Sequence, residues 1–302
     1  MQGGTTTRMD VRFFAPPPRL APYFTTIYRL NVDVSDGGTV TDHLQPEWAG
    51  MRLFTGPGPQ AESGTGAAID GCRMQVGGPS SLPTRFTLST TRLWGFGFLP
   101  LGWATFVSGQ ASDHANWIGD GLETECFAPH RALFEALDGA GDDDNAGFAH
   151  IVAHFERLDR AHPDRARILA IHEAILEPEI AQVQQLADRC SMTTRTLERL
   201  GRKHFGFSPG ILIRRQRLMR TLAAFMLEDS STWSAVIDRN YHDQSHFVRE
   251  FQQFMAMSPS EYAALDHPIL KVFMAERMRI WGSPAQTLDR PGHGSGGDKA
   301  AA

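Results

Sequence analysis

Cysteine, long apolar runs and net positive charge are all scarce in this sequence of 302 residues. The three cysteines, Cys72, Cys126 and Cys190, lie far apart and form no Cys-x-x-Cys pair. This spacing indicates neither a disulfide framework nor a zinc site. No run of about 18 apolar residues occurs, so we expect no membrane-spanning helix and no membrane partner. The first ten residues lack the apolar core of a signal peptide, so a cytoplasmic location is expected.

The distribution of charge is uneven. A formal net charge of −5 by itself argues against nucleic-acid binding. Between Leu186 and Thr221, however, nine Arg and Lys residues stand against only two acidic residues. Attraction to phosphate depends on this local field more than on the total charge. An ordinary solvated helical surface has the same composition, so charge alone leaves both interpretations open.

The chain divides into segments of different character. From Val11 to about Ile118 it is rich in Gly, Pro, Thr and aromatic residues, with short apolar runs at 23–28, 51–54 and 93–99. This pattern predicts an all-β sandwich or barrel. After the polar break at 142–145, apolar residues recur at helical spacing and predict two connecting helices. The expected layout is a β-rich domain at 11–140, connecting helices at 145–178, a helical domain at 179–267 and a disordered tail at 285–302.

The helical segment contains two similar units. In the first, an apolar stripe ends at Cys190, and Thr193 is placed to cap the next helix. That helix has Leu197 and Leu200 on one face, and its other face carries Arg195, Glu198, Arg199 and Arg202. A short helix, a turn and a second helix with inward leucines and outward arginines is a helix-turn-helix pattern. The second helix of such a unit lies in the major groove of DNA, where arginine suits guanine.

A long helix and a second unit follow. Ser208 and Pro209 are suited to begin the long helix, whose arginines at 214, 215, 217 and 220 are expected to stay in water or to reach phosphates. In the second unit, Asp243 is expected to cap a helix whose core positions are Phe247, Phe251 and Phe254. The residues expected to face away from that core are Gln244, Ser245, Val248 and Arg249.

At these positions the sequence resembles the AraC/XylS family of transcription regulators, over roughly residues 179–265. The resemblance rests on runs that occur in order at the family's spacing: Leu186-Ala187, Thr193-x-x-x-Leu197-x-Arg199, Phe205-Gly206-Phe207-Ser208-Pro209, Ile213-Arg214-x-x-Arg217-Leu218, Asp243-Gln244-Ser245-His246-Phe247-x-Arg249-x-Phe251 and Ser258-Pro259-x-x-Tyr262. Weaker fragments, Leu99-Pro100-Leu101-Gly102-Trp103-Ala104 and Ala111-Ser112-Asp113, are similar to a subgroup with a cupin-like sensor domain. The implied fold is α+β and multidomain: a β-rich, cupin-like barrel or sandwich, connecting helices, and an all-α domain with two helix-turn-helix motifs.

The resemblance also implies a function and contact residues. A long helix would bridge two recognition helices that enter successive major grooves, so that the DNA target is asymmetric and nearly two turns long. By matching position, the base contacts would come from Arg195, Glu198, Arg199, Gln244, Ser245, Val248 and Arg249. The phosphate contacts would come from Thr193, Thr194, Arg202, Lys203, Arg214 and Asp243. The implied partners are double-stranded DNA, a small-molecule effector and RNA polymerase; a homodimer is an open alternative, and no cofactor is expected.

Two departures from the family pattern concern turns. The turn glycine common in the family is replaced by Ser191 in the first unit and by Asn240 in the second. Asparagine tolerates the left-handed backbone conformation better than most residues do, whereas serine is less suited to it. We therefore expect the first turn to be the more strained of the two.

An enzymatic or ligand-binding β domain with a helical assembly appendage is the second hypothesis. Cupin-like metal centres need several imidazoles and a carboxylate converging on one ion, and His43, Glu47 and His114 are too sparse for that pattern. An isolated thiol such as Cys72 is more often a small buried hydrophobe than a reactive group. The tryptophans at 48, 94, 103 and 117 fit an ordinary core better than a pocket lining. We therefore expect a regulator rather than an enzyme.

Overall fold

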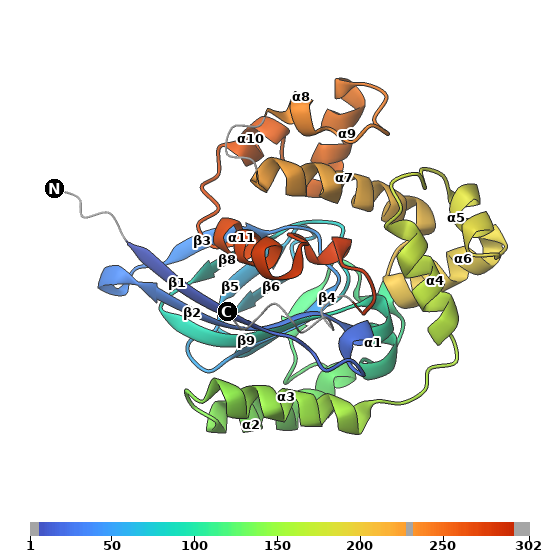
Figure 1. The fold of residues 1–302 in the computed structure, drawn as a ribbon. Helices are drawn as coiled ribbons and strands as arrows, with labels where there is room; N and C mark the ends of the chain where they lie inside the picture. The colour runs from blue at the N-terminus through green and yellow to red at the C-terminus, as the bar shows by residue number, and fades with distance from the viewer. Residues whose placement is uncertain (1–5, 228–231, 293–302) are drawn as a thin grey trace.

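The structure is a computed structural model that describes residues 6–227 and 232–292 (Figure 1). In its N-terminal part, ten strands of the described residues form two antiparallel sheets, one of six strands in the order β1-β2-β9-β4-β7-β10 and one of four in the order β3-β8-β5-β6. The strands are β1 (Thr7–Phe14), β2 (Phe24–Val34), β3 (Val40–Leu44), β4 (Ala49–Phe54), β5 (Gln60–Ser63), β6 (Ala68–Asp70), β7 (Met74–Gly77), β8 (Thr84–Leu88), β9 (Thr91–Phe98) and β10 (Ile118–Asp120). The predicted β-rich domain is confirmed, as two open sheets rather than a closed barrel.

The six-stranded sheet is covered on both faces, so β2 and β9 are buried along almost their whole length. On one face, Phe24 and Phe98 pack against Phe155 of helix α3 (Asp144–Leu158). On the other face, Tyr28 and Leu30 share a core with Phe86 and Leu88 of the second sheet. Trp48, Trp94 and Trp103 are each 1% exposed and belong to the core, as predicted.

Helices cover one side of the β domain and lead out of it. Helices α1 (Pro100–Phe106) and α2 (Arg131–Gly139) were not predicted, whereas α3 and α4 (Arg165–Ile175) are the two predicted connecting helices. Short 3-10 turns lie at Ala21–Tyr23, Ser35–Gly37, Ala111–His114 and Glu125–His130. Asp143 caps α3 by accepting from the amides of Asn145 and Ala146, so the polar break is itself the start of a helix.

The C-terminal part is helical (Figure 1). Its helices are α5 (Val183–Arg189), α6 (Thr194–Leu200), α7 (Pro209–Leu227), α8 (Trp233–Val236), α9 (Gln244–Met255) and α10 (Pro259–Ala263), with a π-helical turn, η5 (Gly201–Phe205), between α6 and α7. The caps predicted at Thr193 and Asp243 are present, because each side chain accepts from the backbone N–H three residues ahead. Among the described residues, no helix has both the length and the apolar content needed to cross a membrane.

Beyond α10 the chain returns to the β domain. Helix α11 (Leu270–Trp281) and the short turn η6 (Gln286–Leu288) lie against the sheets (Figure 1). Predicted disorder from residue 285 is therefore wrong for 285–292, since Thr287 is fully buried and Asp289 pairs with Arg277 inside the protein. The remainder of that prediction, 293–302, lies outside the described residues. We call residues 267–289 the C-terminal strap.

Asp42 of β3 holds the start of the strap. Its carboxylate accepts hydrogen bonds from the amides of Ile269 and Leu270, both at 2.8 Å, and from Nδ1 of His267 at 3.0 Å. A β-domain carboxylate thus satisfies backbone donors at the start of α11 that have no partner within the helix itself. These hydrogen bonds keep the pKa of Asp42 below its usual value although burial, the largest single effect, raises it.

The turn of the first helix-turn-helix unit contains a strained residue. Ser191 has φ of 52°, in the left-handed region, whereas Asn240 of the second turn is not among the described residues with positive φ. The difference expected between the two turns is present, but the cost falls on Ser191 alone.

Ser191→Gly is expected to increase the free energy of unfolding by about 1 kcal/mol. A side chain in the left-handed region costs roughly 1–2 kcal/mol, and the extra flexibility of glycine in the unfolded chain offsets part of that gain. Urea denaturation followed by circular dichroism measures the change. Ser191→Ala is the matched control, because it removes the hydroxyl and keeps the strain. An equal gain in both variants would contradict this explanation.

Candidate DNA-binding interface

Helix α6 presents a polar face because its apolar residues are fixed against α5. Leu197 and Leu200 are fully buried with Leu186, and the Met192 amide donates to the carbonyl of Ala187 at 2.9 Å across the turn. The opposite face leaves Arg195 and Arg199 exposed. An apolar stripe at helical spacing therefore fixes which side chains point outward.

The outward face of α6 contains the rest of the first predicted set. Glu198 is partly buried and lies 3.9 Å from the guanidinium of Arg202. Thr193 and Thr194 are exposed at the start of the helix, where Thr193 Oγ1 accepts from the amide of Thr196 at 3.1 Å. The structure thus brings five of the seven predicted residues of the first unit onto α6 and its cap, and the other two, Arg202 and Lys203, lie in the π-helical turn η5 that follows.

Helix α9 repeats this arrangement. Phe247, Phe251 and Phe254 are buried, as predicted. Gln244, Ser245 and Arg249 are exposed, and Val248 is half-buried at the edge of the core. The reading residues predicted for the second unit therefore lie on one exposed face, with Val248 the least accessible of them.

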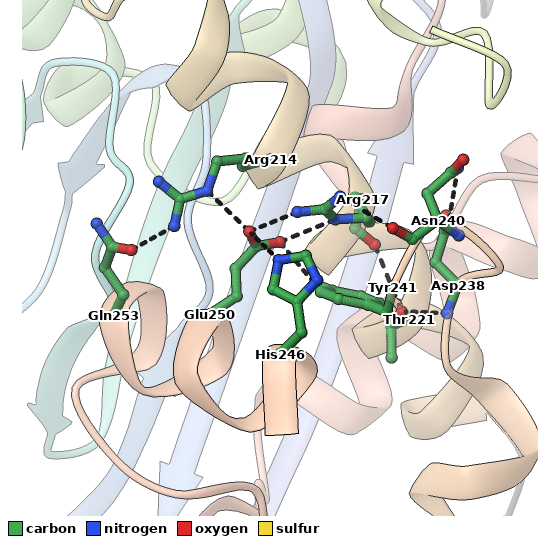
Figure 2. Close-up of polar contacts among 9 residues, drawn as sticks. All are labelled: Arg214, Arg217, Thr221, Asp238, Asn240, Tyr241, His246, Glu250 and Gln253. Atoms are coloured by element: carbon green, nitrogen blue, oxygen red, sulfur yellow. Dashed lines mark hydrogen bonds and ion pairs between the residues drawn. The ribbon is translucent and has the colours of Figure 1, made fainter. Parts of the chain in front are cut away.

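A buried cluster around Glu250 attaches α9 to α7 (Figure 2). Its carboxylate accepts from Nη2 of Arg217 at 2.6 Å, from Nε of Arg214 at 2.8 Å and from the hydroxyl of Tyr241 at 2.8 Å. Burial raises the pKa of Glu250, but the hydrogen bonds from Arg217 and Arg214 outweigh it and leave the pKa below its usual value. Glu250 is therefore ionised and anchors α9 to α7.

Ion pairs account for most of the basic residues between Leu186 and Thr221. Six of the nine pair with a carboxylate: Arg189 with Glu177, Arg202 with Glu198, Lys203 with Asp164, Arg214 and Arg217 with Glu250, and Arg220 with Asp238. Arg215 is buried. Within the described residues, Arg195 and Arg199 have no carboxylate partner, and neither does Arg249 on α9. The arginines left unneutralised are those on the outward faces of α6 and α9.

Comparison with known proteins agrees with this geometry. Residues 186–264 match a family model described as a helix-turn-helix domain. This part of the chain is a helix-turn-helix domain. The predicted resemblance to AraC/XylS regulators is thereby confirmed for this domain.

A curated relative matches part of this chain. It is an uncharacterized HTH-type transcriptional regulator of Haemophilus influenzae, 32% identical over 82 residues, which cover 26% of this chain and 27% of the relative. The match thus spans only about a quarter of that relative's length. Two similar solved structures are ToxT from Vibrio cholerae O395 (11% identity, TM-score 0.41, 85% of this chain and 96% of that one) and the AraC-like transcriptional activator CuxR (12%, 0.34, 72% and 80%).

Several predictions about the long helix of the helix-turn-helix domain are wrong. Its arginines were expected in water or on phosphates, but Arg215 and Arg217 are buried and Arg220 pairs with Asp238 at 2.6 Å. The reason is that α7 lies between other elements, with α9 on one side and the β domain on another. On α7, the basic stripe is therefore held mainly by ion pairs within the protein.

Arg215 connects the helix-turn-helix domain with the β domain. Its guanidinium lies 4.0 Å from the ring centre of Trp48, and Nη1 donates to the carbonyl of Ser80 at 2.8 Å. Nε and Nη2 have no partner among the described residues. Burial lowers the pKa of Arg215 to about 9. Burying a cation that has no carboxylate partner costs free energy. The packing of the surrounding side chains must therefore offset that cost.

Three of the residues predicted to contact phosphate have partners within the protein. Lys203 pairs with Asp164 at 3.2 Å, and Arg214 is held by Glu250 and Gln253. The carboxylate of Asp243 caps α9. Since a carboxylate repels phosphate, only the backbone N–H of Asp243 is suited to contact a phosphate. The exposed Thr193, Thr194 and Arg202 fit the role better.

The sequence reading missed Glu250. Glu250 is an acidic residue among the buried phenylalanines of α9. Arg214 and Arg217 occur three residues apart on α7, so both lie on the same face of that helix. That pattern could have identified the anchor, had the packing of α9 on α7 been known.

The residues considered for a metal enzyme are not brought together. Glu47 pairs with Arg52 at 2.9 Å, the His43 ring lies 6.5 Å from that of His267, and His114 lies 3.4 Å from the Cys126 sulfur. Within residues 6–227 and 232–292, no three His, Cys, Asp or Glu side chains are grouped closely enough to hold a metal ion. Burial raises the pKa of the Cys72 thiol to about 12, which makes it a poor nucleophile.

Glu250→Gln is expected to lower the free energy of unfolding by about 3 kcal/mol at neutral pH, because it leaves two arginines facing a neutral group in a buried site. Since the folded-state pKa of Glu250 lies below the ordinary 4.5, its contribution is complete above pH 4.5 and is lost as the pH falls through the lowered pKa. The difference between wild type and variant should therefore shrink in acid. Urea denaturation across pH measures both effects.

The matched control is Glu276→Gln, which breaks the exposed ion pair with Arg279 on α11. Such surface pairs contribute at most about 1 kcal/mol. Equal losses in the two variants, or a Glu250→Gln loss that does not shrink in acid, would show that the Glu250 cluster is not the anchor.

Proposed function

We propose that the chain is a sequence-specific DNA-binding transcription regulator, and not an enzyme, that inserts α6 and α9 into successive major grooves. The observation that carries this proposal is the placement of its unneutralised arginines. Arg195, Arg199 and Arg249 are exposed and lack a carboxylate partner within the described residues, whereas the arginines around them are paired or buried. An arginine kept free on a recognition helix is available to guanine, whose N7 and O6 accept from it together.

The two reading helices are chemically unequal. The face of α6 has two free arginines, with Glu198 able to accept from a cytosine amino group. The face of α9 has Gln244, which suits adenine, together with Ser245 and Arg249; Val248 could contact only a thymine methyl group. We therefore assign more sequence discrimination to α6, with Thr193, Thr194 and Arg202 as its phosphate contacts.

The division of the chain belongs to the same proposal. Residues 11–140 would form a sensor domain, 145–178 the connection and 179–267 the DNA-binding domain, in a cytoplasmic protein. A small-molecule effector at the β domain would change DNA affinity. Supporting this, α7 contacts the β domain through Arg215 and the α9 anchor through Arg214 and Arg217. RNA polymerase and a second copy of the chain are further partners that the family resemblance implies.

Arg199→Ala is expected to weaken binding to the preferred sequence by ~1–3 kcal/mol and to relax discrimination at one base pair, because it removes a base contact. The preferred sequence is first obtained by in vitro selection with the full chain, and should contain two half-sites about 10 base pairs apart. Fluorescence anisotropy at several salt concentrations then measures affinity and discrimination.

Two control variants separate specific from general effects. Arg202→Ala should weaken binding to all sequences alike and reduce the salt slope by about 1, as expected for a phosphate contact. Arg279→Ala removes an exposed arginine on α11 and should change nothing. Binding that is indifferent to Arg199 and to salt would overturn the proposal and favour an assembly role for the helices.

A further inference from the structure

A cavity of about 80 Å³ lies where the two sheets meet the helical part of the chain. Its walls come from three segments far apart in sequence. The sheets contribute Phe54, Phe86 and Leu93, helix α7 contributes Met219, and the C-terminal strap contributes Phe273 and Met274. A molecule in this cavity would therefore touch the β domain, the bridging helix and the strap at once.

The chemistry of the lining is mainly apolar. The ring of Phe273 packs edge-on against Tyr28, with 4.8 Å between ring centres. Engineered apolar cavities of about 150 Å³ bind benzene, so the smaller space here suits a compact ligand. Apolar walls alone would not favour one apolar molecule over another of the same shape.

Arg277 provides the selective element. It lines the cavity from α11 and is 1% exposed, and Nη2 donates to both carboxylate oxygens of Asp289 at 2.7 Å. Its Nε and Nη1 have no hydrogen-bond partner among the described residues. Buried donors without partners cost free energy, and an oxygen atom within reach of one would recover part of it.

The charges around the cavity balance. Arg277 is matched by Asp289, and Arg52, which also lines the cavity, is matched by both oxygens of Glu47 at 2.9 and 3.0 Å. An anionic ligand would add an uncompensated charge to a buried site, which is unfavourable. The residues therefore favour an uncharged ligand that accepts a hydrogen bond.

We propose that this cavity binds a compact, uncharged, mainly apolar molecule whose carbonyl oxygen accepts a hydrogen bond from Arg277. The inference rests on the proposed function in one respect, that such a molecule would be the effector of DNA binding. The molecule would act through the C-terminal strap. Arg277 lies on α11, and Asp42 of the β domain binds the first residues of that helix. The strap also contacts α7, because the Gln216 amide donates a hydrogen bond of 2.6 Å to the Thr287 carbonyl.

The test uses three probes of one shape class with the full chain: cyclopentanone, methylenecyclopentane and cyclopentanecarboxylate. Methyl resonances of ¹³C-labelled methionine report the location, because Met219 and Met274 line the cavity and Met192 lies in the first helix-turn-helix turn. Cyclopentanone should shift the Met219 and Met274 signals, leave that of Met192 in place, and bind at least about tenfold more tightly than methylenecyclopentane. The carboxylate should bind most weakly.

The variant Arg277→Leu/Asp289→Leu removes the donors and their counter-charge together, which preserves the charge balance. In it, cyclopentanone should bind no more tightly than methylenecyclopentane. Leu88→Phe, which reduces the cavity volume, should abolish binding of both probes and serves as an independent test of the location. Equal affinity of the ketone and the alkene in wild type, tighter binding of the carboxylate, or no shift at Met219 and Met274 would overturn the inference.

Failure of the inference and failure of the proposed function are distinguishable. The probe titrations contain no DNA, so they stand whether or not the chain binds DNA. Affinity for the selected DNA, measured with and without cyclopentanone, then tests the effector role. Ketone binding that leaves DNA affinity unchanged would retain the binding site and remove its regulatory part.

Discussion

Helix α7 packs against α9, against the first helix-turn-helix unit and against the β domain. The buried pairing of its arginines with Glu250 is the interaction on which the rest of the structure depends. Arg214 and Arg217 fix α9, while Leu212 packs in the core that contains Leu197 and Leu200 of the first unit. Because both reading helices are attached to one helix, their spacing is set by the packing of the protein. The same pairing neutralises Arg214 and Arg217, whereas the exposed arginines of α6 and α9 keep their charge unpaired.

Arg215 extends this constraint to the β domain. A guanidinium without a carboxylate, stacked on Trp48 and close to His172, is expensive to bury. Burial, followed by the charge of Arg215, lowers the pKa of His172 to about 3, so this histidine is neutral at ordinary pH. The buried rings around it exclude water from this junction between the two parts.

Local signals in the sequence were sufficient for the two helix-turn-helix units. The caps at Thr193 and Asp243, the buried phenylalanines of α9 and the outward positions of α6 all follow from spacing and side-chain chemistry, and the structure reproduces them. The burial and partners of Arg214, Arg215 and Arg217 could not be predicted from the sequence. An arginine in a basic stripe has the same local pattern whether it faces water or a carboxylate far away in the chain. The order of residues 285–292 was missed for the same reason: Thr287 accepts a hydrogen bond from α7 and Asp289 pairs with Arg277, and composition cannot reveal such contacts.

The central claim is that two reading helices, held on one bridging helix, contact one face of DNA. Hydroxyl-radical footprinting of the full chain on its selected sequence tests it most directly. The account predicts two protected regions on the same face, about one helical turn, or ~10 base pairs, apart. A single protected region, or two regions on opposite faces, would contradict it.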